Sequence, residues 1–225
     1  AGLGKLENAV KSYKEAVLIN PKYSKAHYNL GGAFHELGAL DDSVKSYLKS
    51  LSIDPDYAEA HNNLGNVYRQ KKQLDKAVNS YISAININPD YLEAHYSIGL
   101  VFQDLGQTDL MISHIKKVIT IKPNFAEAHN NLGIALKRNG KLDDAILSYK
   151  NALAIQPNNI EAYNNLGNVF KEKGLEGATM DEIANSSGFG KATLYYYFKS
   201  KEDVLSEILN EGWMKIWESL EPVIA

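Results

Sequence analysis

The chain repeats one pattern of apolar and polar positions every 34 residues, over the stretches 24–57, 58–91, 92–125 and 126–159. In each stretch a leucine or isoleucine stands at the seventh position, a glycine at the eighth, and an aromatic residue or leucine at the eleventh. Together with the fourth position, these residues lie on one face of a helix with about 3.6 residues per turn. The first part of every stretch therefore predicts an amphipathic helix.

The second part of each stretch predicts another helix. In most stretches it carries a small residue at the twentieth position and an aromatic residue at the twenty-fourth. A proline ends it, because proline cannot continue a helix and disfavours helical geometry in the residue before it. These prolines are Pro21, Pro55, Pro89, Pro123 and Pro157. The turn between the two helices is marked by Gly38, Gly106, Gly140 and Gly174, and Lys72 takes this place in one stretch.

The glycines at the eighth position predict close packing of the two helices. They are Gly31, Gly65, Gly99, Gly133 and Gly167. A glycine inside a helix costs about 1 kcal/mol relative to alanine, so its recurrence indicates that the partner helix approaches closely. In one repeat Met111 and Ile115 replace the usual alanine and tyrosine. We expect that repeat to stack with looser local packing.

This pattern, with a half repeat ending at Pro21 and another over Ile160–Gly174, resembles the tetratricopeptide repeat (TPR) family. The resemblance covers about Leu3 to Gly174. It implies an all-α fold, an α-solenoid of antiparallel helix pairs over residues 1–174. It also implies that the first helices of the repeats line the inner surface, which in this family receives peptides.

Asparagine recurs on the face of the first helices that lies opposite the apolar positions. An amide offers a donor and an acceptor side by side, so a ladder of asparagines can pair with a peptide backbone of any sequence. With the histidines at the fourth position, it resembles the TPR arm of O-GlcNAc transferases, which implies that the asparagines hold polypeptide backbone. The alternative is that asparagine is a tolerated polar residue on a solvated face. The candidate groove residues are Asn29, Asn63, Asn66, Asn131, Asn165 and Asn168.

The histidines at the fourth position are His27, His61, His95 and His129. We expect packing rather than metal binding, because side chains from successive repeats lie about a helix diameter apart and cannot converge on one ion. The chain has no cysteine, which removes thiolate ligands and nucleophiles. No convergent polar cluster indicates catalysis. We therefore expect no metal, no cofactor and no enzymatic activity.

A different pattern follows residue 174. Thr179 and Glu182 form a capping box that opens a helix. Residues 186–190 read as a turn, 191–198 as a short second helix, and Ser200 with Asp203 as the start of a third. Two short helices joined by a glycine-containing turn predict a helix-turn-helix domain.

These residues resemble the DNA-binding domain of the tetracycline-repressor (TetR) family, over about Val169 to Pro222. By that resemblance the residues facing DNA would be Lys191, Thr193, Tyr196 and Tyr197, and those holding phosphates would be Thr179 and Lys201. Gly190 stands where the family usually has serine. From Lys171 onward there are six lysines, no arginine and ten acidic residues, so we expect DNA binding to be weak at most.

The two patterns meet in one segment, Val169–Gly174, which satisfies both the end of a TPR first helix and the start of the TetR-like domain. We therefore expect a TPR domain over 1–174 and a TetR-like domain over 160–225 that share the helix 160–174. Natural domains are usually joined by linkers. Our interpretation is an engineered shared-helix fusion that acts as a helical scaffold with a latent peptide-binding groove. The alternative is a TetR-like transcriptional regulator with a TPR protein-interaction arm.

Composition adds three expectations. The net charge of −3 argues against general binding of polyanions. No apolar run reaches the roughly 18 residues of a membrane span and no signal peptide is evident, so we expect a soluble, cytoplasmic protein. The final helix, about 201–220, is too apolar to be exposed all round, which predicts self-association near Trp213 and Trp217.

Overall fold

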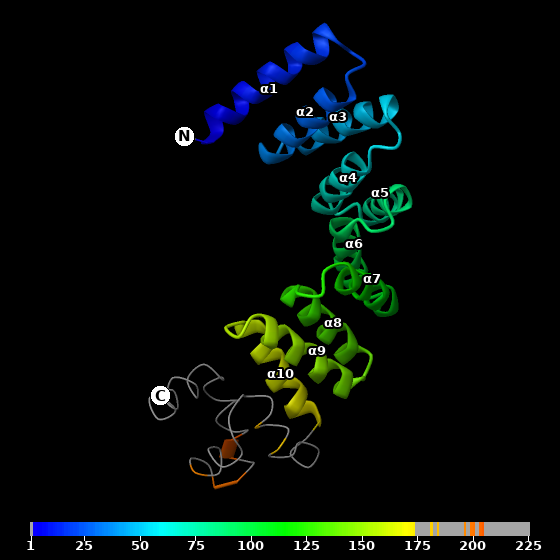
Figure 1. The fold of residues 1–225 in the computed structure, drawn as a ribbon. Coiled ribbons are helices and arrows are strands. Elements are labelled where there is room, and N and C mark those ends of the chain that lie inside the picture. The colour runs from blue at the N-terminus through cyan, green and yellow to red at the C-terminus, as the bar shows by residue number, and fades with distance from the viewer. Residues whose placement is uncertain are drawn as a thin grey trace. The chain divides into compact units, whose positions relative to one another are not determined.

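The computed structural model describes residues 2–173 and, beyond them, seven single positions. These are Asp181, Ala184, Tyr196, Lys199, Ser200, Asp203 and Val204. All ten elements within residues 2–173 are α-helices, which confirms the all-α prediction for this part of the chain (Figure 1). The chain divides into two compact units, Ala1–Ile121 and Lys122–Ala225.

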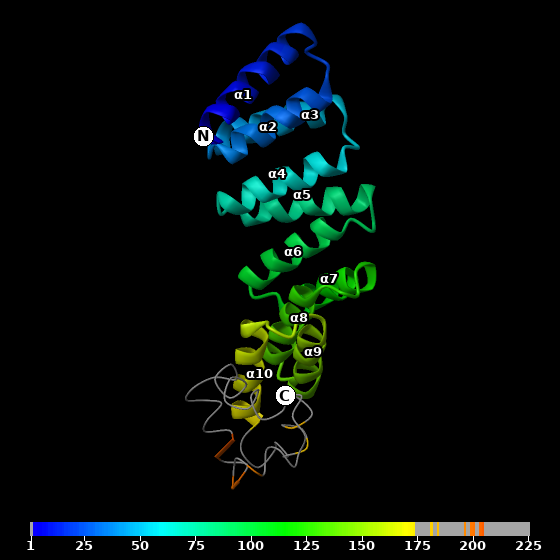
Figure 2. The same ribbon diagram turned by 60° about the vertical axis from the view of Figure 1, so that its left-hand side comes forward.

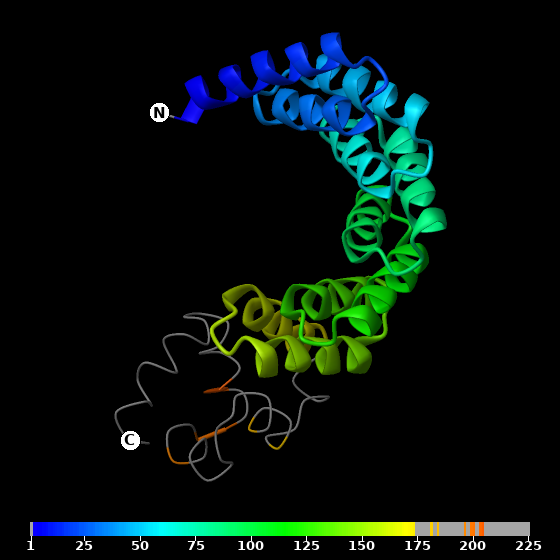
Figure 3. The same ribbon diagram turned by 45° about the horizontal axis from the view of Figure 1, so that its top comes forward.

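The first unit is a row of helix pairs. Figure 2 shows α2 beside α3, α4 beside α5, and α6 beside α7, and in Figure 3 these helices follow one another in a curved stack from blue to green. The first helices of neighbouring repeats also pack together, α2 with α4 and α4 with α6. The helices are α1 (Gly2–Ile19), α2 (Ser24–Glu36), α3 (Leu40–Ile53), α4 (Ala58–Gln70), α5 (Leu74–Ile87), α6 (Leu92–Asp104) and α7 (Thr108–Ile121).

The second unit repeats this arrangement in its described part. It contains α8 (Ala126–Arg138), α9 (Leu142–Ile155) and α10 (Ile160–Lys173). α9 packs between α8 and α10, and α8 also contacts α10. Val169 and Phe170 near the end of α10 are buried. Phe170 is the eleventh-position aromatic, which is expected to be buried in a TPR first helix.

The core of each repeat is wider than the sequence pattern indicates. The seventh and eighth positions are buried as expected, but the third and tenth positions are buried as well, for example Ala60 and Val67 in α4. The fourth position is only partly buried in His27 and His61. The sequence pattern does not predict burial at the third position, because alanine is common on exposed as well as on buried helix faces.

The close approach expected at the eighth-position glycines is confirmed. A Cβ atom built on Gly65 would lie 2.7 Å from Cε1 of Tyr81, a separation that real side chains do not show. Gly99 faces Ile115 instead, and a Cβ atom there would lie 2.9 Å from its Cδ1 atom. Met111 and Ile115 are fully buried, so the divergent repeat stacks as predicted. The separation of 2.9 Å at Gly99 compares with 2.9, 2.7 and 2.5 Å at Gly31, Gly65 and Gly133 in the tyrosine-containing repeats.

The turn after each first helix closes with the same two backbone hydrogen bonds. After α2, Gly38 N donates to His35 O at 2.9 Å, and Ala39 N donates to Phe34 O at 2.9 Å. This Schellman arrangement requires a left-handed backbone at its central residue, which glycine adopts without strain. Gly38, Gly106 and Gly140 have φ values of 74°, 70° and 70°, and Lys72 takes the same place with φ of 59°.

We expect Lys72→Gly to raise the free energy of unfolding by up to about 1 kcal/mol. A residue with a Cβ atom in the left-handed region costs roughly 1–2 kcal/mol, and the larger backbone entropy of unfolded glycine offsets part of that gain. Urea unfolding followed by circular dichroism measures the change. Lys49→Gly is the matched control, because this exposed residue lies inside α3 and its replacement should cost about 1 kcal/mol. A loss of stability in both variants would contradict the strain at Lys72.

Candidate functional site

A hollow of about 310 Å³ is lined by residues of α1, α2, α3 and α4 of the first unit. We call it the tyrosine hollow, because three tyrosines form much of its wall. Its lining residues are Leu6, Ala9, Tyr13, Tyr28, Asn29, Gly32, Ala33, Glu36, Tyr47 and Asn63. Two of the asparagines that the sequence singled out, Asn29 and Asn63, therefore lie at one site. Tyr13 and Tyr47 are twenty-fourth-position aromatics of the repeat pattern, whereas Tyr28 is not part of that pattern.

Hydrogen bonds hold one edge of the tyrosine hollow in place. Asn63 Nδ2 donates to the Tyr28 hydroxyl at 3.0 Å, and Asn63 Oδ1 accepts from Asn62 Nδ2 at 3.3 Å. The Tyr28 ring packs against Tyr57 and Tyr47, with ring centroids 4.8 Å and 5.8 Å apart. Tyr28 is thus fixed from several sides, and the site exists before any ligand arrives.

A further asparagine of α4, Asn66, is also engaged within the protein. The Tyr81 hydroxyl donates to Asn66 Oδ1 at 2.7 Å. Asn62 is buried, and its Oδ1 atom has no hydrogen-bond partner among the described residues. An unpaired buried acceptor is costly, so this oxygen marks a place where a donor would be stabilising.

In the second unit the candidate asparagines differ in their access to solvent. Asn131 is only 8% exposed, less than the helical periodicity implies. Asn165 is partly buried and donates from Nδ2 to Asn130 Oδ1 at 3.0 Å. Asn168 is exposed on α10. The asparagine positions are therefore not equivalent: Asn168 is exposed, Asn131 is buried and the others are partly buried.

Burial and nearby carboxylates raise the pKa of Tyr28 and Tyr91 in the first unit. Burial raises the pKa of Tyr28, and the Glu59 carboxylate raises it further. Burial, with smaller contributions from Glu59 and Glu93, raises the pKa of Tyr91 to about 12. The hydroxyl groups are neutral at physiological pH, so they can both donate and accept hydrogen bonds.

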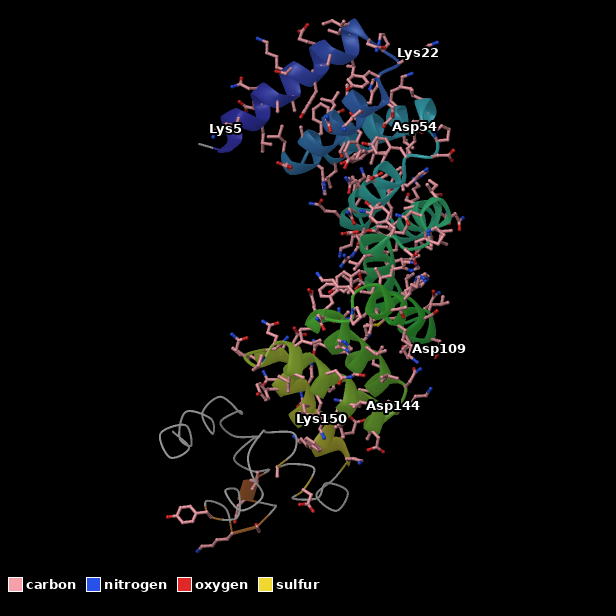
Figure 4. The ribbon with its side chains drawn as sticks, viewed as in Figure 1. Lys5, Lys22, Asp54, Asp109, Asp144 and Lys150 are labelled. Carbon is pink, nitrogen blue, oxygen red and sulfur yellow. The ribbon has the colours of Figure 1, made fainter. Side chains whose placement is uncertain are left out.

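The recurring histidines anchor the loop that precedes each first helix. The Nε2 atom of His27 lies 3.1 Å from the carbonyl oxygen of Pro21, and that of His61 lies 2.9 Å from Pro55 O. His95 and His129 repeat the contact with the prolines that precede them. A carbonyl only accepts, so each histidine donates from Nε2. These loops contain the residues labelled Lys22 and Asp54 in Figure 4.

One of these histidines has a second partner. His95 Nδ1 lies 3.0 Å from His114 Nδ1 on α7, and the His114 ring stacks on Phe102 with centroids 5.5 Å apart. Because His95 already donates from Nε2, its Nδ1 atom accepts, and His114 donates from Nδ1. Burial and, to a smaller extent, the adjacent His95 lower the pKa of His114 to about 4. The pair is therefore neutral at physiological pH.

Most of the candidate DNA-binding residues lie outside the described part of the chain. These are Thr179, Lys191, Thr193, Tyr197 and Lys201, and the same holds for Trp213 and Trp217. Tyr196 is helical and 81% exposed.

One element of the helix-turn-helix prediction is confirmed. Ser200 N donates to Asp203 Oδ2 and Asp203 N donates to Ser200 Oγ, each at 3.1 Å. This is the reciprocal capping box that was expected to open the third helix.

Within the described residues, no helix is long and apolar enough to cross a membrane. The same residues contain no group of three or more histidine, cysteine, aspartate or glutamate side chains placed to hold a metal ion.

Comparison with protein-family models identifies both sequence patterns. A model described as TPR repeat matches residues 2–38, 31–69, 65–106 and 135–174. Two further models of the tetratricopeptide repeat match 92–125 and 114–146. A model described as bacterial regulatory proteins, tetR family, matches residues 168–208. Both resemblances inferred from the sequence are thereby confirmed. No curated relative matches the chain.

Solved structures share the solenoid. A crystal structure of MamA is 29% identical, covers 68% of this chain and 90% of its own, and has a TM-score of 0.66. YrrB, described as a TPR protein with an unusual peptide-binding site, is 21% identical over 79% of this chain and 93% of its own, with a TM-score of 0.68. The first TPR domain of Spaghetti (RPAP3), bound to an HSP90 peptide, is 22% identical over 51% of this chain and 91% of its own, with a TM-score of 0.50.

Proposed function

The chain belongs to the tetratricopeptide repeat family, and from this premise we propose that it binds an extended polypeptide along the first helices of its repeats. The observation that carries the proposal is the tyrosine hollow, where Asn29 and Asn63 lie beside Tyr28 and Tyr47. Amides and neutral hydroxyls on a fixed surface are suited to pairing with peptide backbone. YrrB and RPAP3, which share this fold, are described as binding peptides.

The geometry divides the asparagines between two roles. Asn63 and Asn66 hold tyrosines, and their replacement would disturb the repeat as well as any ligand. Asn29 lines the hollow, is partly exposed, and belongs to none of the side-chain hydrogen bonds described above. Asn29 is therefore the residue whose replacement isolates ligand binding from stability.

We expect Asn29→Ala to weaken peptide binding about threefold to tenfold, the effect of losing one hydrogen bond worth about 0.5–1.5 kcal/mol. The probe is a fluorescein-labelled decapeptide of alternating serine and glutamine, an uncharged peptide that tests backbone recognition. Fluorescence polarisation with the full chain gives the Kd. Asn8→Ala, an exposed asparagine of α1 outside the hollow, should bind the probe as the parent does. Equal affinity in Asn29→Ala and Asn8→Ala would rule out the proposed groove.

We further propose that α10 is shared by the two domains, 1–174 and 160–225, in a chimeric helical scaffold without a catalytic role. The support is the overlap of the TPR and tetR-family matches over residues 168–174, within and just after a helix that continues to Lys173. A continuous helix that belongs to two domains fixes their relative orientation, which a flexible linker would not do. This arrangement is what an engineered rigid fusion requires.

The second candidate is a cytoplasmic DNA-binding regulator that uses its repeats to recruit a partner. The tetR-family match over residues 168–208 favours it, and the acidic balance after Lys171 opposes it. A gel mobility shift with palindromic duplexes at low salt separates the two. Sequence-dependent binding at nanomolar concentration would replace the scaffold proposal, since a single unassisted half-site supports about half of the binding free energy of a dimer.

A further inference from the structure

The tyrosine hollow combines aromatic rings with a carboxylate. The rings of Tyr13, Tyr28 and Tyr47 form its wall, and Glu36 lies on its lining at the last turn of α2. Glu36 is exposed, and among residues 2–173 no ion pair engages its carboxylate. At about 310 Å³, the hollow is at the small end of the range of ligand pockets, which suits one side chain rather than a large ligand.

The charge around these rings is negative. Glu36 raises the pKa of Tyr47, in addition to the larger effect of burial, which places this carboxylate electrostatically close to the innermost ring. The Glu59 carboxylate likewise raises the pKa of Tyr28 and of Tyr57. Among the described residues, the only carboxylates or cations that act on the pKa of these three tyrosines are carboxylates.

Two basic side chains of the first helices have partners of their own. Arg69 on α4 lies 3.9 Å from Asp104 on α6, at the distance limit of an ion pair. The neighbouring His35 pairs its Nε2 atom with Gln70 Oε1 at 2.8 Å. Among residues 2–173, no ion pair engages the carboxylate of Glu36 or of Glu59. A cation brought by a ligand would meet a field that favours it.

We propose that the tyrosine hollow receives the side chain of a lysine or arginine in the extended peptide, and this proposal rests on the peptide-binding function proposed above. The cationic group is attracted by the faces of the tyrosine rings and by the Glu36 carboxylate, and the aliphatic stem packs on the aromatic wall. An acidic side chain in the same place would be repelled by Glu36. The surface is thus selective for basic over acidic peptides.

The test uses three fluorescein-labelled decapeptides that differ only in alternate positions, serine–lysine, serine–glutamine and serine–glutamate. Fluorescence polarisation with the full chain gives the Kd of each at low and at physiological salt. We expect the lysine peptide to bind about fivefold to tenfold more tightly than the glutamine peptide at low salt, with a smaller ratio at physiological salt. The glutamate peptide should bind most weakly.

Two variants locate the selectivity. Glu36→Gln should bring the ratio of lysine to glutamine affinity down to about twofold, because the charge is lost and the side-chain shape is kept. Glu15→Gln removes the same charge from an exposed position of α1 outside the hollow and should keep the full ratio. Both residues are exposed, so neither change is expected to affect folding.

The outcomes separate the two proposals. Equal binding of the lysine and glutamine peptides, or an equal loss of selectivity in Glu36→Gln and Glu15→Gln, would overturn the basic-peptide proposal and leave the groove intact. Failure of all three peptides to bind at millimolar protein concentration would overturn both.

Discussion

Gly65→Ala is expected to lower the free energy of unfolding of the first unit by about 2 kcal/mol. The added methyl group would lie 2.7 Å from Cε1 and 2.8 Å from Cδ1 of Tyr81. Forcing extra atoms into a packed core costs typically 1–3 kcal/mol, occasionally more, and alanine returns about 1 kcal/mol through its higher helix propensity. The net loss is set by how far the Tyr81 ring can move.

Tyr81 has little freedom to make room for the methyl group. Its side chain is fully buried, and its hydroxyl is held by Asn66 at 2.7 Å on the same helix as Gly65. Moving the ring away from α4 would break this hydrogen bond, and leaving the ring in place would force α4 and α5 apart. We therefore place Gly65→Ala at the upper end of the cost of overpacking.

Gly32→Ala is the matched control. The nearest atom to a Cβ on Gly32 is the Tyr47 hydroxyl oxygen, at an ordinary contact distance of 3.6 Å. This substitution should leave stability unchanged or raise it by up to about 1 kcal/mol. Urea unfolding followed by circular dichroism at 222 nm measures both variants. Equal free energies of unfolding for Gly65→Ala and Gly32→Ala would mean that contact with the Tyr81 ring does not set the distance between α4 and α5.

The second large effect is a loss of stability in mild acid that depends on His114. In the folded chain burial holds the pKa of this residue at about 4, against about 6.5 in the unfolded chain. Between these values the unfolded state binds more protons, so the free energy of unfolding rises with pH across this window. The contribution of the neutral His114 ring to stability is fully present above about pH 6.5 and is lost as the pH falls towards 4. We expect a loss of about 1–2 kcal/mol, below the full linkage value because the ring keeps partial access to water.

His114→Ser provides the comparison, because the chain itself uses serine at this position in other repeats. Ser46, Ser80 and Ser148 occupy the equivalent place and donate to the backbone carbonyl four residues earlier, at 2.8–2.9 Å. The variant should be less stable at neutral pH but should vary less between pH 6.5 and 4. Urea midpoints at several pH values measure the slope. A slope unchanged in His114→Ser would assign the acid sensitivity to other groups.

Much of the fold follows from residues whose role is fixed locally. The prolines and the turn glycines determine where helices end, and the eighth-position glycines indicate where two helices meet most closely. These effects depend on backbone geometry, which the residue type itself restricts. Lys72 shows the limit of that logic, because its left-handed φ of 59° is imposed by the surrounding turn and not by the residue.

The candidate site was harder to read from the sequence, because it depends on which partners the polar groups find. The spacing identified Asn63 and Asn66 as polar residues on one face, but not that tyrosines from other helices engage them. It also gave no sign that Asn131 is largely buried. Such contacts join residues 15 to 35 positions apart, for example Tyr81 with Asn66 and Asn63 with Tyr28. A periodic pattern of residue types does not predict which side chains make them.

The nearest-neighbour packing of the first unit has a consequence for how it acquires its structure. Its principal contacts join consecutive helices or helices two places apart. The entropy lost in closing a loop grows with the length of the loop, and each of these contacts closes a short one. Folding can therefore start at any adjacent pair of helices and spread in both directions, with a low contact order and no slow search for distant partners.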